Sequence, residues 1–236
     1  MANTYTTAGL VSALNNINSA TSKTQTARFF ANGGLLNMST APVSQYQSKP
    51  MINGVVQNGT LFISAPSINS LKEAAGLTPT KAMQAILAHE MGHAFYQQLL
   101  YLRQPGDNAD IGAKADWCFM REGAASIYAY TVALESGSNF VAGTTMFPNL
   151  YDAIAARMVG LTPGTQQFQD IGIRIASEYF AGDLAYIAFC YNPRNWEPPK
   201  IYPISSVPGN ETSFAAWSCG RIPQAGGYWQ KVNTSE

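Results

Sequence analysis

The chain has 236 residues, of which 46% are hydrophobic, and its 14 basic and 14 acidic side chains cancel to a formal net charge of zero. This composition is typical of a globular protein with enough apolar material for a sizeable core. Without a net positive field the chain has no long-range attraction for phosphate backbones, so we expect no nucleic-acid partner.

The first twenty residues lack the features of a secretory signal peptide, because they have neither a basic start nor a continuous apolar stretch. No segment approaches the roughly 18 consecutive apolar residues of a transmembrane helix. We therefore expect no membrane span. We also expect the chain to be either cytosolic or exported by a route that does not use a Sec-type signal.

The N-terminal third contains signals for one helix and one hairpin. Apolar residues recur at spacings of four and three over 7–19, which predicts a short amphipathic helix. Over 51–64, two β-prone runs flank Asn58 and Gly59, a pair that readily forms tight turns. We predict a β-hairpin there.

The strongest helix start lies at Thr78 and Pro79, because threonine can cap free backbone amides and proline is tolerated in the first helical turn. We predict that this helix runs to about Arg103, where a segment containing proline and glycine interrupts it. A second apolar face predicts a helix over 115–136, with a glycine near its end.

Further helices are predicted over 151–159 and 165–191, the second of them weakened by Gly172 and Gly182. The segment 192–236 is rich in proline, which predicts extended and turn structure that wraps the domain. Together the elements predict an α+β fold that is mainly helical, with a small N-terminal antiparallel sheet or hairpin.

The three cysteines, Cys118, Cys190 and Cys219, show none of the short paired spacings of a zinc knuckle. They fit three buried thiols, which behave as small hydrophobic groups. If two of them form a disulfide, the pair that we expect is Cys190 and Cys219, because it would fasten the C-terminal segment to a helix.

The chemistry of the chain centres on one segment of the first long helix, His89-Glu90-Met91-Gly92-His93. Residues four apart stand one turn above each other, so both histidines project from the same face of the helix. Two imidazoles placed in this way can bind one zinc ion, which accepts neutral imidazole nitrogens at about 2.0 Å.

Glu90 lies about 100° around the helix from His89, where it can flank a zinc-bound water without being a ligand. Zinc lowers the pKa of such a water towards neutrality, and Glu90 would take its proton as general base. The motif also occurs on helices whose histidines are core residues. Its apolar flanks and the absence of any other histidine in the chain favour a metal site.

A catalytic zinc site needs a third protein ligand. A metzincin would have glycine and a third histidine where this chain has Tyr96 and Leu99, so that class is excluded. Our choice is Glu122, because it lies inside the second predicted helix, and two helices joined by a loop of about a dozen residues can pack antiparallel and bring it to the metal. The alternatives are Asp110, Asp116 and Glu178.

The histidine motif, followed by Glu122-Gly123-Ala124-Ala125, resembles the gluzincin branch of the zincin metallopeptidases. The resemblance covers about 90 residues, from 51 to 136. It implies zinc ligands His89, His93 and Glu122 with Glu90 as general base, in a single zincin-like domain over 1–236. It also implies a small sheet before the active-site helix, whose edge strand pairs with an extended substrate. The hairpin at 51–64 is in place to supply that strand.

The chain departs from this pattern in two ways. The 28 residues between His93 and Glu122 are more than in better-known gluzincins, and no downstream histidine exists to stabilise an oxyanion. Electrostatic stabilisation of the developing negative charge usually contributes a large part of the rate enhancement. We expect Tyr179 to supply it, with Tyr186, Tyr202, Tyr228 and Arg174 as alternatives. Support for a zinc-bound histidine is expected from Ser126, Asp116 or Asp183.

These residues predict a zinc-dependent metallopeptidase that hydrolyses peptide bonds or amide bonds of cell-wall peptide. The compact, weakly charged chain suits an exported bacterial effector or toxin, whose partner would be a cognate inhibitor or immunity protein. The alternative is a non-enzymatic binding or structural module, with core histidines or a structural metal. A closing fourth ligand such as Cys118 would favour that alternative.

Overall fold

The computed structural model describes residues 5–49, 58–97, 104–106, 108–137 and 148–191. Its elements, in chain order, are α1 (Thr7–Asn15), α2 (Ala20–Ala31), β1 (Leu35–Ser39), β2 (Gln45–Gln47), β3 (Thr60–Ser64), α3 (Ala65–Ala75), α4 (Pro79–Phe95), α6 (Ile111–Ser136), α7 (Pro148–Arg157), α8 (Gln166–Gly182) and α9 (Leu184–Cys190). The described part is mainly helical with one small sheet before α4, which confirms the α+β class. The predicted wrap at 192–236 lies outside the described residues.

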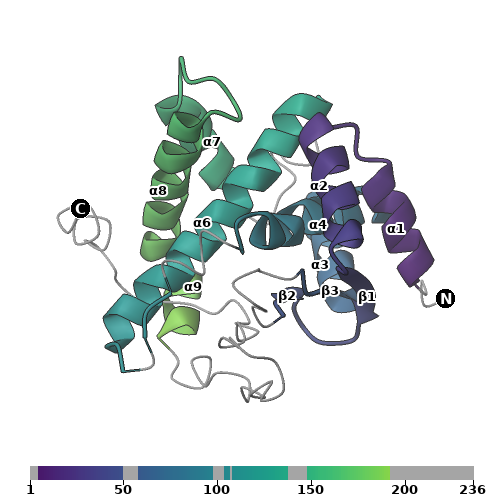
Figure 1. Cartoon of the computed structure of the whole chain (residues 1–236), viewed down its shortest axis with the longest axis horizontal. Helices are drawn as coiled ribbons and strands as arrows, with labels where there is room; N and C mark the ends of the chain where they lie inside the picture. The colour runs from purple at the N-terminus through teal and green to yellow at the C-terminus, as the bar shows by residue number, and fades with distance from the viewer. Residues whose placement is uncertain (1–4, 50–57, 98–103, 107, 138–147, 192–236) are drawn as a thin grey trace.

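Helix α6 runs through the middle of the molecule, with α7 and α8 on one side and the sheet, α1, α2 and α3 on the other (Figure 1). Helix α4 packs against α6 and also against α1, α3 and the sheet. Every residue of α4 from 82 to 94 is buried, as is every residue of α6 from 115 to 129. A helix covered on all sides lies inside the core, so α4 and α6 form the centre of the protein.

The sheet has the strand order β1-β3-β2, with β1 parallel and β2 antiparallel to β3. The expectation of a purely antiparallel sheet is therefore wrong. The antiparallel partner of β3 is the strand Gln45–Gln47, whereas the first run of the predicted hairpin, 51–57, lies outside the described residues. Among the described strands, β2 is an edge of the sheet.

Asn58 and Gly59 do not act as the tight turn that their sequence suggested. The Asn58 side chain donates a hydrogen bond to the backbone carbonyl of Phe29 at 3.1 Å, which ties the start of β3 to α2. A Cβ on Gly59 would lie 1.8 Å from the carbonyl oxygen of Gln47. Glycine is therefore required here by a close approach of two backbones rather than by a turn conformation.

The structure confirms the predicted start of α4 and the predicted glycine at the end of α6. The Thr78 side chain caps α4, and the Asp110 side chain caps α6 by accepting a hydrogen bond from the Ala113 amide at 2.9 Å. Helix α6 begins four residues before the predicted start and ends at Gly137, whose φ of 57° is left-handed. The capping Asp110, one of the alternative ligands, is therefore used structurally.

Helix α4 ends earlier than its sequence indicated. Its last residue is Phe95, and Tyr96 has φ −91° and ψ 9°, so the prediction of one helix to about Arg103 is wrong. No glycine or proline marks this end. The Phe95 ring packs against Tyr128 of α6, with 5.2 Å between ring centroids, so a tertiary contact accompanies the end of the helix.

The helices of the C-terminal half occur where the sequence predicted them, with one division. Helix α8 ends at Gly182 and α9 begins after Asp183, which accepts hydrogen bonds from two amides of α9. The predicted weak point at Gly182 is thus confirmed. Gly172 lies inside α8, where a Cβ would come within 2.4 Å of Ile127, so this glycine permits helix packing.

A disulfide joins Cys118 of α6 to Cys190, the last residue of α9. The expected pair of Cys190 and Cys219 is therefore wrong, as is the view of three free thiols. Helix α9 packs on α6 and α8, which places the Cα atoms of the bonded residues 6.3 Å apart. Cys219 lies outside the described residues.

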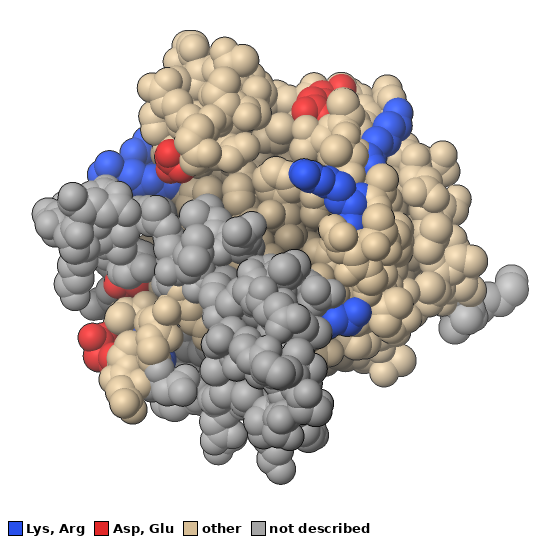
Figure 2. Space-filling model, in the orientation of Figure 1, with Lys and Arg blue, Asp and Glu red and all other residues tan. Residues whose placement is uncertain are grey.

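Charged groups are sparse and scattered over the face of the molecule shown in Figure 2, without a patch of one sign. This agrees with the balanced charge of the sequence. Among the described residues, no helix is both long enough and apolar enough to cross a membrane.

One exposed carboxylate, Glu135 near the end of α6, holds the N-terminus of α2. It accepts hydrogen bonds from the Ser19 hydroxyl at 2.6 Å, the Thr21 hydroxyl at 2.6 Å and the Thr21 amide at 2.9 Å. Partial burial would raise the pKa of Glu135, but these hydrogen bonds favour the charged form and lower it.

We expect Glu135→Gln to lower the free energy of unfolding by about 1 kcal/mol, measured by urea denaturation at pH 7. Because the folded pKa of Glu135 is lowered, its stabilisation is present above the unfolded value of 4.5 and is lost as the pH falls through the folded pKa. The matched control is Glu178→Gln, whose exposed ion pairs with Arg157 and Arg174 should contribute less. Equal stabilities of Glu135→Gln and the wild type would contradict the capping role.

Candidate metal centre

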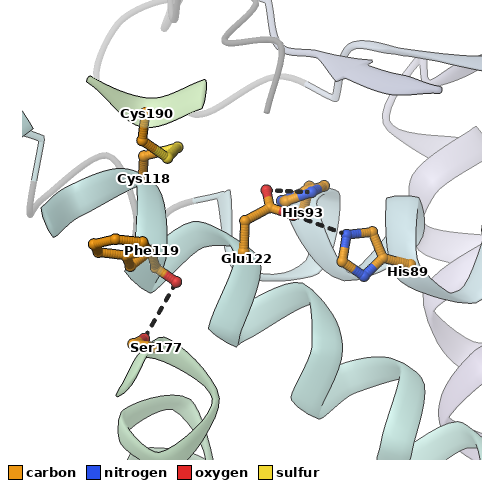
Figure 3. Close-up of a disulfide and its surroundings, with 7 residues drawn as sticks. All are labelled: His89, His93, Cys118, Phe119, Glu122, Ser177 and Cys190. Atoms are coloured by element: carbon orange, nitrogen blue, oxygen red, sulfur yellow. Dashed lines mark hydrogen bonds and ion pairs between the residues drawn. A yellow bond between two sulfur atoms is a disulfide. The ribbon is translucent and has the colours of Figure 1, made fainter. Parts of the chain in front are cut away.

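Three buried side chains from two helices converge at the centre of the protein. Nε2 of His89 lies 3.3 Å from Oε2 of Glu122, and Nε2 of His93 lies 3.4 Å from Oε1 of the same carboxylate. All three potential ligand atoms lie within 4.8 Å of one another. Figure 3 shows the Glu122 side chain pointing from α6 towards both imidazoles on α4.

The backbone geometry explains why these side chains meet. His89 and His93 stand one turn apart on α4, with ring centroids 5.0 Å apart and ring planes at 89°. Between them, a Cβ on Gly92 would lie 2.6 Å from Cα and 2.7 Å from the carbonyl oxygen of Ala125 on α6. Only glycine allows α4 to approach α6 this closely, which brings Glu122 to the histidines.

The donor atoms of this cluster are close enough to share one metal ion. The two imidazole nitrogens face different oxygens of one carboxylate, at 3.3 and 3.4 Å, and His89 lies within hydrogen-bond distance of that carboxylate. The donor set of two imidazoles and one carboxylate is also that of many catalytic zinc sites, so His89, His93 and Glu122 can together hold a zinc ion.

The pKa values of the two histidines shift in opposite directions. Burial lowers the pKa of His93 to about 3, although the charge of Glu122 opposes this effect. Burial would also lower the pKa of His89, but its hydrogen bond with Glu122 and the charges of Glu122 and Glu90 raise it. A neutral imidazole is the form that binds metal, so His93 is ready to act as a ligand over the whole neutral range.

Glu90 lies beside this cluster with 4% of its surface exposed. Burial and the nearby charge of Glu122 raise its pKa to about 7, while His89, Arg121 and a hydrogen bond from the Tyr46 backbone lower it. Its Oε2 makes no hydrogen bond with any described residue. A buried carboxylate with one unused oxygen and a pKa near neutrality is suited to take a proton from a bound water.

Two residues at this site were missed by sequence reasoning. Arg121 is buried, its guanidinium lies 5.1 Å from the centre of the Trp117 ring, and its charge acts on Glu90 and His93. An arginine inside an apolar helix and next to a proposed ligand was the signal available for it. The other is Tyr46 of β2, whose backbone forms a hydrogen bond with Glu90. No sequence signal pointed to it, because this contact depends on the sheet lying beside α4.

The alternative third ligands lie elsewhere. Glu178 is on the exposed side of α8, paired with Arg157 and Arg174. Asp116 is buried in α6, and its charge adds to the effect of burial in raising the pKa of Tyr191, as does the charge of Asp110. Of the described carboxylates, only Glu122 joins the two histidines in a potential metal cluster.

The residues expected to support catalysis are not brought to the cluster by their described contacts. Tyr179 packs edge-on against Phe180, and burial and the charge of Asp183 raise its pKa. The alternatives Tyr186 and Arg174 lie against Phe180 and Glu178 respectively, and Tyr202 and Tyr228 lie outside the described residues.

Two of the residues expected to support a zinc-bound histidine, Ser126 and Asp183, do not do so. The Ser126 hydroxyl is fully buried and makes no hydrogen bond with any described residue, so the predicted bond to a histidine is not formed. Asp183 caps α9 instead. Cys118 is held in a disulfide, so its sulfur is not a thiolate that could close the site as a fourth ligand.

Comparisons with protein-family models, with curated proteins and with solved structures found no match to this chain.

Replacing Gly92 by alanine tests whether the approach of α4 to α6 assembles the cluster. The added methyl would meet backbone atoms of Ala125, so the helices must separate. We expect Gly92→Ala to lower the free energy of unfolding by roughly 1 to 3 kcal/mol. We also expect at least tenfold weaker zinc binding, measured by competition with a chromogenic chelator.

The matched control is Gly182→Ala at the end of α8, where a new Cβ meets no atom within 4 Å. This change should leave zinc affinity unaltered and stability equal or slightly higher. If Gly92→Ala bound zinc as tightly as the wild type, helix approach would not control the position of the ligands.

Proposed function

We propose that this protein is a zinc-dependent hydrolase of peptide bonds, with His89, His93 and Glu122 as the metal ligands and Glu90 as the general base. The observation that carries the proposal is the pair of separations of 3.3 and 3.4 Å between the imidazole nitrogens and the oxygens of one carboxylate. Two imidazoles and one carboxylate that converge in this way form the donor set of a known class of catalytic zinc site. The resemblance of the motif to gluzincins supports the same ligand set.

Each residue of the site has a defined task in this mechanism. When bound, zinc supplies a Lewis acid that polarises a carbonyl and lowers the pKa of a bound water. His89, His93 and Glu122 would hold the ion. Glu90 accepts the proton of the attacking water on its unused oxygen and then delivers it to the leaving nitrogen.

The position of β2 supports an extended peptide as substrate. This strand is an edge of the sheet, and the backbone of its central residue, Tyr46, donates a hydrogen bond to Glu90. A peptide added along this edge would pass beside the general base, and main-chain hydrogen bonds would hold it. In this proposal β2 takes the substrate-binding role first expected of the hairpin at 51–64.

Three expectations drawn from the sequence remain predictions. Tyr179 as oxyanion donor, cell-wall peptide as substrate, and an effector role with an immunity protein as partner are not supported by particular contacts. The disulfide at Cys118 weighs against a closed structural metal site, because it removes the thiolate considered as a fourth ligand.

The Glu90→Gln variant tests the proposal. The purified variant should contain close to one zinc per chain, as should the wild type, because Glu90 is not a ligand. Its hydrolysis of a mixed peptide library, followed by mass spectrometry, should fall roughly 10²- to 10⁴-fold, since an amide cannot accept the proton.

Glu73→Gln, which alters an exposed carboxylate on α3, is the control and should keep full activity. A wild type that binds no zinc, or a Glu90→Gln variant with undiminished hydrolysis, would end the proposal.

A further inference from the structure

The turn of α6 that leads to Glu122 is fastened from one side by the disulfide. Cys118 lies four residues before Glu122, so both side chains project from the same face of the helix. Its sulfur is bonded to Cys190, which ends α9, and both cysteines are buried. In Figure 3 the disulfide stands on the same helix as Glu122, one turn away.

Helix α8 holds the same turn from another side. The Ser177 hydroxyl lies 3.2 Å from the carbonyl oxygen of Phe119 and 2.7 Å from that of Ile173. A Cβ on Gly123 would come within 2.6 Å of the Ser177 oxygen. The backbone of α6 therefore has no room to move towards α8 at this turn.

The position of this turn matters for the metal cluster in particular. Side chains on a helix lean towards its N-terminus, so the Glu122 carboxylate lies over the turn that begins at Cys118. Both measured imidazole separations of the cluster end on an oxygen of Glu122. Because metal–ligand distances tolerate only about 0.2 Å, a small shift of this turn would disturb both separations together.

We propose that the Cys118–Cys190 disulfide is a positioning element for the metal ligand Glu122. By fixing α9 to α6 one turn before the ligand, it keeps the carboxylate at the distance that both histidines require. This inference rests on the proposed metal centre. The competing view is that the bond, which spans 72 residues of sequence, only stabilises the fold as a whole.

A double-mutant cycle separates the two views. Cys118→Ala and Cys190→Ala are each made in the full-length chain, with and without Glu122→Ala, in a Cys219→Ser background that prevents thiol exchange. Zinc dissociation constants are measured by competition with a chromogenic chelator. Each cysteine variant should bind zinc roughly tenfold more weakly when Glu122 is present and show no further loss when Glu122 is absent.

A control variant accounts for the general loss of stability. Ile154 is fully buried on α7, which packs against α8 and away from the cluster. Ile154→Ala should destabilise the fold by leaving a cavity, yet keep zinc affinity within twofold of the wild type. Circular dichroism of every variant at the same temperature reports whether the chain remains folded.

Several results would overturn the inference. These are unchanged zinc affinity in both cysteine variants, an equal loss with and without Glu122, or a similar loss in Ile154→Ala. If a cysteine variant does not fold, oxidised wild type is compared with wild type treated with a phosphine reductant, with thiols counted. A folded reduced chain with roughly tenfold weaker zinc binding supports the inference, and unfolding on reduction or unchanged affinity overturns it.

The failure of this inference differs visibly from failure of the proposed function. If the wild type shows no zinc binding that depends on Glu122, the metal centre itself is wrong. If that binding exists and the disulfide has no effect on it, only the positioning role is wrong.

Discussion

The direct approach of two helix backbones, α4 at Gly92 and α6 at Ala125, is the contact on which the rest of the structure depends. A single methyl group at Gly92 would fall within 2.7 Å of backbone atoms that cannot move aside. This approach buries both helices from all sides and makes the paired histidines face Glu122. The core and the candidate metal centre are thus products of the same packing.

The composition of this contact is unusual for a protein core. His89, His93, Glu90, Glu122 and Arg121 are all buried where α4 and α6 meet. Buried ionisable groups are costly unless they are paired or bind a metal. A divalent cation held by the three converging donors would offset the charge of the two carboxylates, which is a physical reason to expect a metal where so many ionisable groups meet.

The small sheet and the disulfide each contact one helix of this centre: β2 packs on α4, and the disulfide is attached to α6. Strand β2 passes Glu90 as an edge of the described sheet, where in the proposed enzyme a peptide backbone would be added. The disulfide and Ser177 restrain α6 next to Glu122. In the proposed enzyme, the base therefore lies towards the substrate edge, whereas the carboxylate ligand is held by rigid packing.

The sequence by itself determined the local features: the four-residue spacing of His89 and His93, the helix start at Thr78 and Pro79, and the glycine end of α6. Each depends on neighbours a few residues away, so the printed sequence contains the whole cause. Tertiary structure decided which distant segments meet. It chose β2 as the antiparallel partner of β3, Cys118 as the partner of Cys190, the end of α4 at Phe95, and the arrival of Glu122 beside the histidines. These outcomes follow from packing between elements, which spacing along one chain cannot specify.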